Sequence, residues 1–375
     1  MALSSVNFEL DSGGITLNVD ELTFKRPTSE QMLAQIQGLH WRIQLANFFE
    51  DIYRPNRVGI DTLTLNTSQQ TNSADFSLEG LKRSLSLETL EIVSFFESLT
   101  IAKTRIEGEQ IFEIASLDIG RNGQQLLMRI TDQEINQQLF DLTLALSVEQ
   151  LDRDGFLTLP MVMKNEEFSL LSNLKIYHQN AHDYLEFSGF IDQIQAADLD
   201  KYLPAALIGE STNQWMARGF KSGVLQDVKL HALKNISQDL PIETNLSAHL
   251  TDSELSFNAN WQALQHLDAD INTDGKAINV LVNSTTLYDL PLTNIALAME
   301  DMGQANLDVS IVGNIQTDSK ALTDFLAQAP LGDTVHNVIE QFSLTGELTG
   351  EFDLIIPLDN RASTLDIDLS IKDNQ

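Results

Sequence analysis

Apolar and polar residues alternate along much of this 375-residue chain. Between residues 344 and 356 every even position is apolar or glycine, and the odd positions are threonine or acidic until Ile355 breaks the rule. Successive side chains of an extended strand point to opposite faces of a sheet. This segment therefore has one oily face and one acidic face.

The same alternation recurs in segments that lie far apart in the chain. Apolar side chains take alternate positions in 142–148, 307–311 and 365–371, with mostly polar residues between them. Such segments predict a mostly β protein whose long sheet has one solvated side. The function therefore depends on what covers the apolar side of this sheet.

Turn residues indicate how the first strands connect. Gly13-Gly14, Asn122-Gly123 and Asp154-Gly155 are typical of hairpins, because positive φ costs little only for Gly, Asn and Asp. They predict an antiparallel strand meander over residues 1–197.

Two segments have helical rather than strand spacing, 196–220 and 319–342, and they form an internal repeat. They align without a gap at an offset of 123 residues. At this offset Tyr202-Leu203 matches Phe325-Leu326, Gly223 matches Gly346, and Leu225 matches Leu348. We expect two short broken-helix inserts, each followed by strands. The predicted parts are the meander 1–197, a first repeat copy 198–318, and a truncated second copy 319–375.

Composition excludes several classes of partner and site. The formal net charge is -31, from 54 acidic against 23 basic residues, so we expect no nucleic acid partner. The chain has no cysteine, which excludes disulfides and thiolate metal sites. No apolar run approaches the roughly 20 residues of a membrane-spanning helix. The start lacks the pattern of a secretion signal, which favours a piece of a longer protein over a complete cytoplasmic one.

The candidate metal sites in the sequence are incomplete. His178 and His182 have a metal-like spacing that works on a helix, but they lie where a loop between strands is expected. Asp270, Asn272, Asp274 and Gly275 resemble the start of a calcium loop, yet Leu281 stands where its closing Glu belongs. We therefore expect a hairpin turn there, no metal or other cofactor, and no enzyme. A carbohydrate-active enzyme on a β-sandwich and an outer-membrane barrel remain weaker alternatives.

Several motifs resemble one known family. They are Lys201-Tyr-Leu-Pro204 with Trp215 and Gly223, residues 257–261 leading into the strand 267–271, Ala329-Pro-Leu-Gly-Asp-Thr334, and Ile355-Ile-Pro-Leu-Asp359. Their order and spacing resemble the YhdP branch of the AsmA-like proteins, most clearly over residues 198–375.

The resemblance implies a large envelope protein of Gram-negative bacteria, anchored in the inner membrane by an N-terminal helix. It implies a mostly β fold, with a long twisted antiparallel sheet rolled into an elongated, taco-like groove. The implied function is a periplasmic segment of a phospholipid transport bridge from inner to outer membrane. Phospholipid is then the partner, the two membranes are reached through other parts of the full-length protein, and we expect a monomer.

An apolar groove needs no catalytic residue, only strands that keep the same face apolar. The expected lining consists of alternating apolar positions: Leu142, Leu144, Leu146, Ile278, Val280, Val282, Leu307, Val309, Ile311, Leu344, Leu348, Phe352, Leu354, Ile356, Leu365, Ile367 and Leu369. The alternative for each is an ordinary closed core, as in a structural or adhesive β-repeat protein of the envelope.

Overall fold

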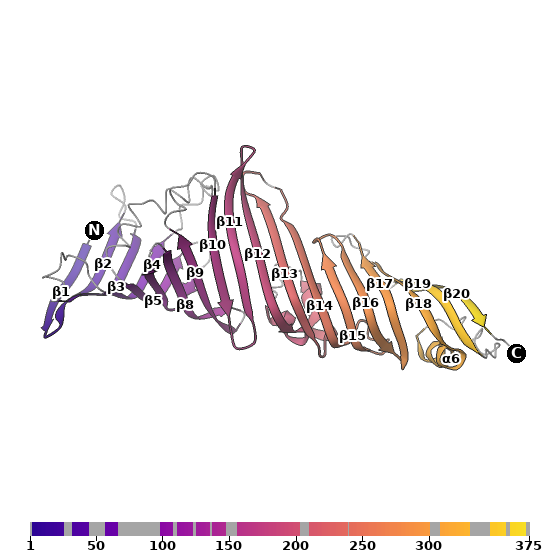
Figure 1. The fold of residues 1–375 in the computed structure, drawn as a ribbon. Coiled ribbons are helices and arrows are strands. Elements are labelled where there is room, and N and C mark those ends of the chain that lie inside the picture. Colours follow the sequence, from indigo (N-terminus) through magenta and orange to yellow (C-terminus); the bar gives the residue numbers. More distant parts are fainter. Residues whose placement is uncertain are drawn as a thin grey trace. The chain divides into compact units, whose positions relative to one another are not determined.

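The fold consists mainly of strands that follow one another in the sheet (Figure 1). The computed structural model describes residues 2–25, 32–44, 57–66, 98–107, 111–122, 125–135, 137–147, 156–202, 210–238, 240–300, 308–330, 346–357 and 361–372. The first twelve strands are β1 (Ala2–Asp11), β2 (Gly14–Lys25), β3 (Met32–Gln44), β4 (Arg57–Asn66), β5 (Ser98–Glu107), β6 (Ile111–Ile114), β7 (Leu117–Asn122), β8 (Gln125–Ile135), β9 (Gln138–Ser147), β10 (Phe156–Lys164), β11 (Ser169–Gln179) and β12 (His182–Gln195). The others are β13 (Val224–Asn235), β14 (Glu243–Leu255), β15 (Leu264–Thr273), β16 (Ile278–Leu287), β17 (Leu290–Met299), β18 (Asp308–Asp318), β19 (Glu347–Pro357) and β20 (Thr364–Lys372).

These strands belong to one 20-stranded sheet, which confirms the predicted mostly β, antiparallel fold. One described pair departs from the predicted meander, because β4 and β5 run parallel, with Ile60 opposite Ile101. A parallel pair needs a long connection that returns the chain to the same end of the sheet. The connecting residues 67–97 lie outside the described residues.

The chain divides into two compact units. Unit 1 comprises Met1–Phe187 with Leu233–Ile242, and unit 2 comprises Ser188–Ala232 with Glu243–Gln375. In unit 1 the apolar side chains share one face, since Ile101 is opposite both Ile60 and Leu117. A neighbouring buried cluster on β8 to β11 consists of Leu126, Leu146, Leu157 and Ile176.

The predicted turn at Gly13-Gly14 is present. The Asp11 carboxylate accepts hydrogen bonds from the backbone N–H groups of Gly13 (2.7 Å) and Gly14 (2.9 Å), which closes the β1–β2 hairpin. These bonds hold the pKa of Asp11 below its usual range, and the bond from Gly13 has the largest effect. Gly123 and Gly155, which belong to the other two predicted turns, lie outside the described residues.

Unit 2 contains β-bulges on several of its strands. Asp252 on β14, His266 on β15 and Asn294 on β17 have left-handed φ values of 47°, 51° and 54°. Register shifts accompany them, for example between Leu250 and Ser253. A bulge adds one residue to one strand and bends it, so Leu250 and Ser253 are both buried although they are three residues apart.

The predicted helical inserts are present where they are described. The first comprises a 3-10 helix η3 (Ala196–Asp198), α3 (Leu199–Tyr202) and α5 (Glu210–Gly219), and the second begins with α6 (Ser319–Gln328). Asp318 caps α6 by accepting a hydrogen bond from the Ala321 N–H at 2.8 Å. Residues 203–209 and 331–345, including Leu344, lie outside the described residues.

One backbone hydrogen bond occurs at corresponding positions of the two predicted repeat copies. Ala196 N–H donates to the carbonyl of Gly223 at 2.9 Å, and Ser319 N–H donates to Gly346 at 3.1 Å. The two glycines have nearly equal left-handed φ values, 109° and 107°. The offset of 123 residues therefore pairs positions with the same backbone geometry.

Replacing Gly223 by Ala should destabilise unit 2 by about 2–4 kcal/mol, because the residue needs left-handed φ and has no room for a methyl group. A Cβ at Gly223 would lie 2.5 Å from the Cβ of Ser253. Gly120→Ala is the matched control, since nothing lies within 4 Å of its Cβ position. Urea unfolding followed by Trp fluorescence measures both variants; equal free energies of unfolding for the two would contradict the strain at Gly223.

Candidate functional site

The apolar candidates of unit 2 form rows that cross the strands. Val280 is opposite Leu297, Leu297 is opposite Ile311, Ile311 is opposite Leu354, and Leu354 is opposite Leu365. Directly opposed residues of an antiparallel pair share one face of the sheet. Five strands, β16 to β20, thus contribute to one row.

A second row runs beside the first. Ile278 is opposite Met299, which is opposite Val309, which is opposite Ile356. Sequence reasoning missed Leu297 and Met299, although their neighbours on both sides were candidates. The bulge at Asn294 interrupts the alternation of β17, so the apolar face of this strand is not apparent from the sequence.

The remaining candidates lie elsewhere. Leu142, Leu144 and Leu146 are on β9 in unit 1, where their partners on β8 are Ile130, Met128 and Leu126. Leu307 and Leu344 lie outside the described residues. For Leu369 the strand is described, and it is opposite Gly350, but the side chain is not.

Exposure differs along this face. The half-buried candidates are Ile278, Val280, Val309, Ile311, Leu365, Ile367 and Phe352, together with Leu142 and Leu144 in unit 1. The buried candidates are Val282, Leu348, Leu354 and Ile356, together with Leu146 in unit 1. One face therefore contains both core positions and positions that solvent reaches.

Helix α6 covers one end of the face. Its Leu322 and Leu326 form a buried cluster with Ile315 of β18 and Leu348 of β19. Leu348 is fully buried, at 0% exposure, because the helix lies on it. In this structure Leu348 is a core residue beneath a helix, and it lines no exposed surface.

An aromatic row follows the same end of unit 2. The ring centroids of Phe257 and Trp261 are 5.8 Å apart, those of Trp261 and Tyr288 are 6.5 Å apart, and those of Tyr288 and Phe325 are 5.8 Å apart. These rings link the segment before β15 to the β16–β17 turn and to α6. Such contacts add stability beyond the area that they bury.

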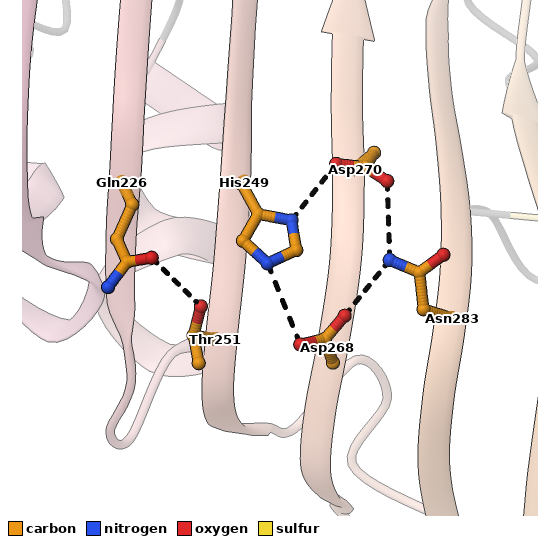
Figure 2. A network of polar contacts seen from close by, with 6 residues as sticks. All are labelled: Gln226, His249, Thr251, Asp268, Asp270 and Asn283. Atoms are coloured by element: carbon orange, nitrogen blue, oxygen red, sulfur yellow. Dashed lines mark hydrogen bonds and ion pairs between the residues drawn. The ribbon is translucent and has the colours of Figure 1, made fainter.

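The opposite face of unit 2 carries polar networks (Figure 2). His249 contacts two carboxylates, Asp270 at 2.9 Å through Nδ1 and Asp268 at 3.6 Å through Nε2. The amide of Asn283 donates to both, at 2.9 Å to Asp268 and 3.2 Å to Asp270. Hydrogen bonds from His249 and then Asn283 hold the pKa of Asp270 below its usual range. The four side chains tie β14, β15 and β16 together.

The expected hairpin at Asp274-Gly275 is present. The carboxylate of Asp274 accepts from the backbone N–H groups of Lys276 at 2.9 Å and Ala277 at 2.8 Å. His178 Nδ1 lies 2.8 Å from the Asp183 carboxylate beside the β11–β12 turn. Within the described ranges, no group of three or more His, Asp or Glu residues is arranged to hold a metal ion.

Acidic residues face one another on β19 and β20. Glu351 is opposite Asp368, and Asp353 is opposite Asp366. Opposed like charges destabilise a strand pair unless water solvates them. This arrangement fits a solvated face and gives no sign of a catalytic pair.

A shallow cavity of about 310 Å³ opens on unit 2, away from α6. Its lining residues are Lys229, Leu230, His231, Asn245, Leu246, Ser247, Asn272, Thr273, Asp274 and Asn279. None of the helices in the described part of the chain combines the length and apolar character needed to cross a bilayer.

Comparison with known proteins gives a family and one relative. A family model described as YhdP protein matches residues 115–375. The intermembrane phospholipid transporter YhdP of Escherichia coli (strain K12) is 20% identical over 179 residues, which are 46% of this chain and 14% of that protein. The chain thus spans a small part of that relative's length. No solved structure matches.

The network around His249 makes the stability of unit 2 depend on pH through Asp270. Because the folded-state pKa of Asp270 is lowered, its contribution is present above the unfolded-state value of about 4 and disappears as pH falls through the folded-state value. Asp270→Asn should therefore lower the urea midpoint at pH 7, and the difference from the unsubstituted chain should narrow toward pH 3.

Asp353→Asn is the control for this measurement, because it removes a carboxylate that faces another carboxylate, Asp366. Its urea midpoint at pH 7 should stay the same or rise. A difference for Asp270→Asn that does not change with pH would show that the network contributes through something other than the charge of Asp270.

Proposed function

Because this chain belongs to the YhdP protein family, as the resemblance predicted, we propose that it carries phospholipid within the envelope of a Gram-negative bacterium. In this proposal the acyl chains lie along an apolar groove formed by the rows of unit 2, and the headgroups stay in water at its open rim. The chain acts as a conduit and performs no chemistry.

The observation that carries the proposal is the continuity of the apolar rows. The row across β16 to β20 consists of Val280, Leu297, Ile311, Leu354 and Leu365, of which Leu354 is buried and the other four are half-buried. Neighbouring strands are about 4.8 Å apart, so a lipid tail moving along the row meets the next apolar side chain before leaving the last. Such a surface favours movement because no step exposes the tail to water.

The energetic need for such a surface is large. Each methylene moved from water to an apolar surface gains about 0.8 kcal/mol, so exposing two sixteen-carbon tails would cost roughly 25 kcal/mol. A lipid therefore needs cover over its whole path between two membranes. The named relative is an intermembrane phospholipid transporter, which supports phospholipid as the cargo.

The solvated face suits a periplasmic location. The charge of -31 and the acidic residues of β19 and β20 keep a large sheet in solution. In the proposal this chain is a periplasmic, monomeric segment of a longer bridge. Other parts of that protein reach the inner and outer membranes.

Charged substitutions on the apolar rows should abolish lipid binding without unfolding the chain. Ile311→Glu and Val280→Glu place a carboxylate at half-buried positions, so an acyl tail there would have to desolvate it. Ser310→Glu and Asn279→Glu are matched controls on the neighbouring residues of the same strands, which point to the other face.

The measurement uses fluorescent phosphatidylethanolamine that co-elutes with each purified variant in gel filtration, with a thermal melt to verify folding. Bound lipid should fall at least fivefold for the first two variants and stay within a factor of two for the controls. A folded chain that binds no lipid before substitution would instead favour the structural or adhesive repeat with a closed core.

A further inference from the structure

The apolar face of unit 2 has a sharp internal boundary. One row is buried on each strand that it crosses, namely Leu250 (1%), Ala269 (0%), Val282 (2%) and Ile295 (4%), which lie on β14 to β17. The next positions outward on the same face, Ile271 and Val280 for example, are half-buried. Burial therefore becomes complete within two residues on β15, β16 and β17, whereas on β14 the next position outward, Ala248, is buried as well.

On β15 to β17 this boundary coincides with the bulges of the paired strands. Register shifts follow directly after Leu250 on β14 and lie between Thr293 and Ala296 on β17. A bulge bends its strand, so the strands turn where the row becomes buried. The boundary in this part of unit 2 is a property of the backbone.

On β18, where Ile315 is buried and Ile311 is half-buried, the boundary has a different cause. The neighbouring strand β19 has no such boundary, because Leu354 and Ile356 are buried as well as Leu348. The pairing of β18 with β19 continues from Asp308 to Asp318 without a register shift, so no bulge bends these strands. Here Gly313 is opposite Phe352, and a Cβ on Gly313 would lie 2.8 Å from ring atom Cε1 of Phe352 and 3.0 Å from Cγ1 of Ile295. The phenyl ring thus occupies the space above the glycine and extends toward Ile295.

Helix α6 supports the ring from behind. Phe352 and Ile367 pack against the buried cluster of Leu322, Leu326 and Leu348. On the other side of the ring, Val309 and Ile311 are half-buried. From Val309 to Gly313 the face extends over four residues, or about 14 Å.

We propose that Phe352, lying over Gly313 and supported by α6, is the end wall of the acyl-chain site. This inference rests on the proposed function and adds to it the position at which a lipid tail stops. Tails contact the rows of Val280 and Ile311 and do not reach the face beneath α6. The side chain of Phe352 sets the depth of the site on β18, where the backbone supplies no bend.

The test uses the absence of native cysteine, which allows one label per molecule. Single cysteines at Ile311, Thr317 and Ser310 carry a bimane fluorophore, and vesicles of phosphatidylethanolamine with a nitroxide on the acyl chain supply the quencher. Ile311 lies outside the wall, Thr317 lies on the same face behind it, and Ser310 faces the other side of the sheet. We expect strong quenching at 311 and background quenching at 317 and 310.

Removing the ring should extend the site. In Phe352→Ala, quenching at 317 should rise at least threefold while quenching at 310 stays at background. Phe352→Leu retains a bulky side chain and is the second variant if the alanine variant does not fold; it should raise quenching at 317 by a smaller factor. Thermal melts verify the fold of each variant.

The outcomes separate this inference from the proposed function. Equal quenching at 311 and 317 before any substitution overturns the wall and leaves lipid carriage standing. An unchanged signal at 317 in both folded Phe352 variants overturns the role of this residue. Background quenching at 311 overturns lipid carriage itself.

Discussion

The structure depends on the register with which neighbouring strands pair. Each apolar row exists because residues such as Leu297 and Ile311 stand directly opposite each other, and a slip by one residue would turn a strand's apolar side chains to the solvated face. The bulges do not violate this constraint. Between Leu250 and Ser253 the extra residue keeps both side chains on the buried face while the strand bends. Register thus decides which side chains gather on one face, and the bulges decide where that face turns.

The same face serves two purposes in unit 2. Near α6 it is an ordinary core, in which Leu348 is fully buried beneath Leu322 and Leu326. Farther along the same strands, Val309 and Ile311 retain exposed apolar surface. The core supplies the stability that an exposed apolar surface cannot, because side chains left in contact with water contribute little burial energy. A single strand therefore contains both core positions and half-buried apolar positions, and for the latter the role as a lining stays a prediction.

The sequence predicted those features that have a strict period or a strict conformational need. Alternation located the strands, and the positive φ of Gly223 and Gly346 explains why the repeat could be aligned on these residues. The sequence could not predict the features that depend on contacts between distant segments. The turn at Tyr288 and Asp289 has left-handed φ at both residues without a glycine, and the burial of Leu348 requires knowing where α6 packs. Gly313 in a strand signals a close approach, but its partner Phe352 is 39 residues away.

Whether the helical inserts would obstruct a lipid depends on the direction in which the boundary between buried and half-buried residues runs. The buried row from Leu250 to Ile295 crosses the strands, and so does the half-buried row through Val280 and Ile311. The two rows therefore run side by side, and α6, which packs on β18 and β19, borders the proposed path instead of crossing it. In both copies of the repeat the insert is fixed at the same point, by a backbone bond to Gly223 or Gly346. If the proposed lipid path is right, the inserts of unit 2 border the apolar rows and leave movement from strand to strand free.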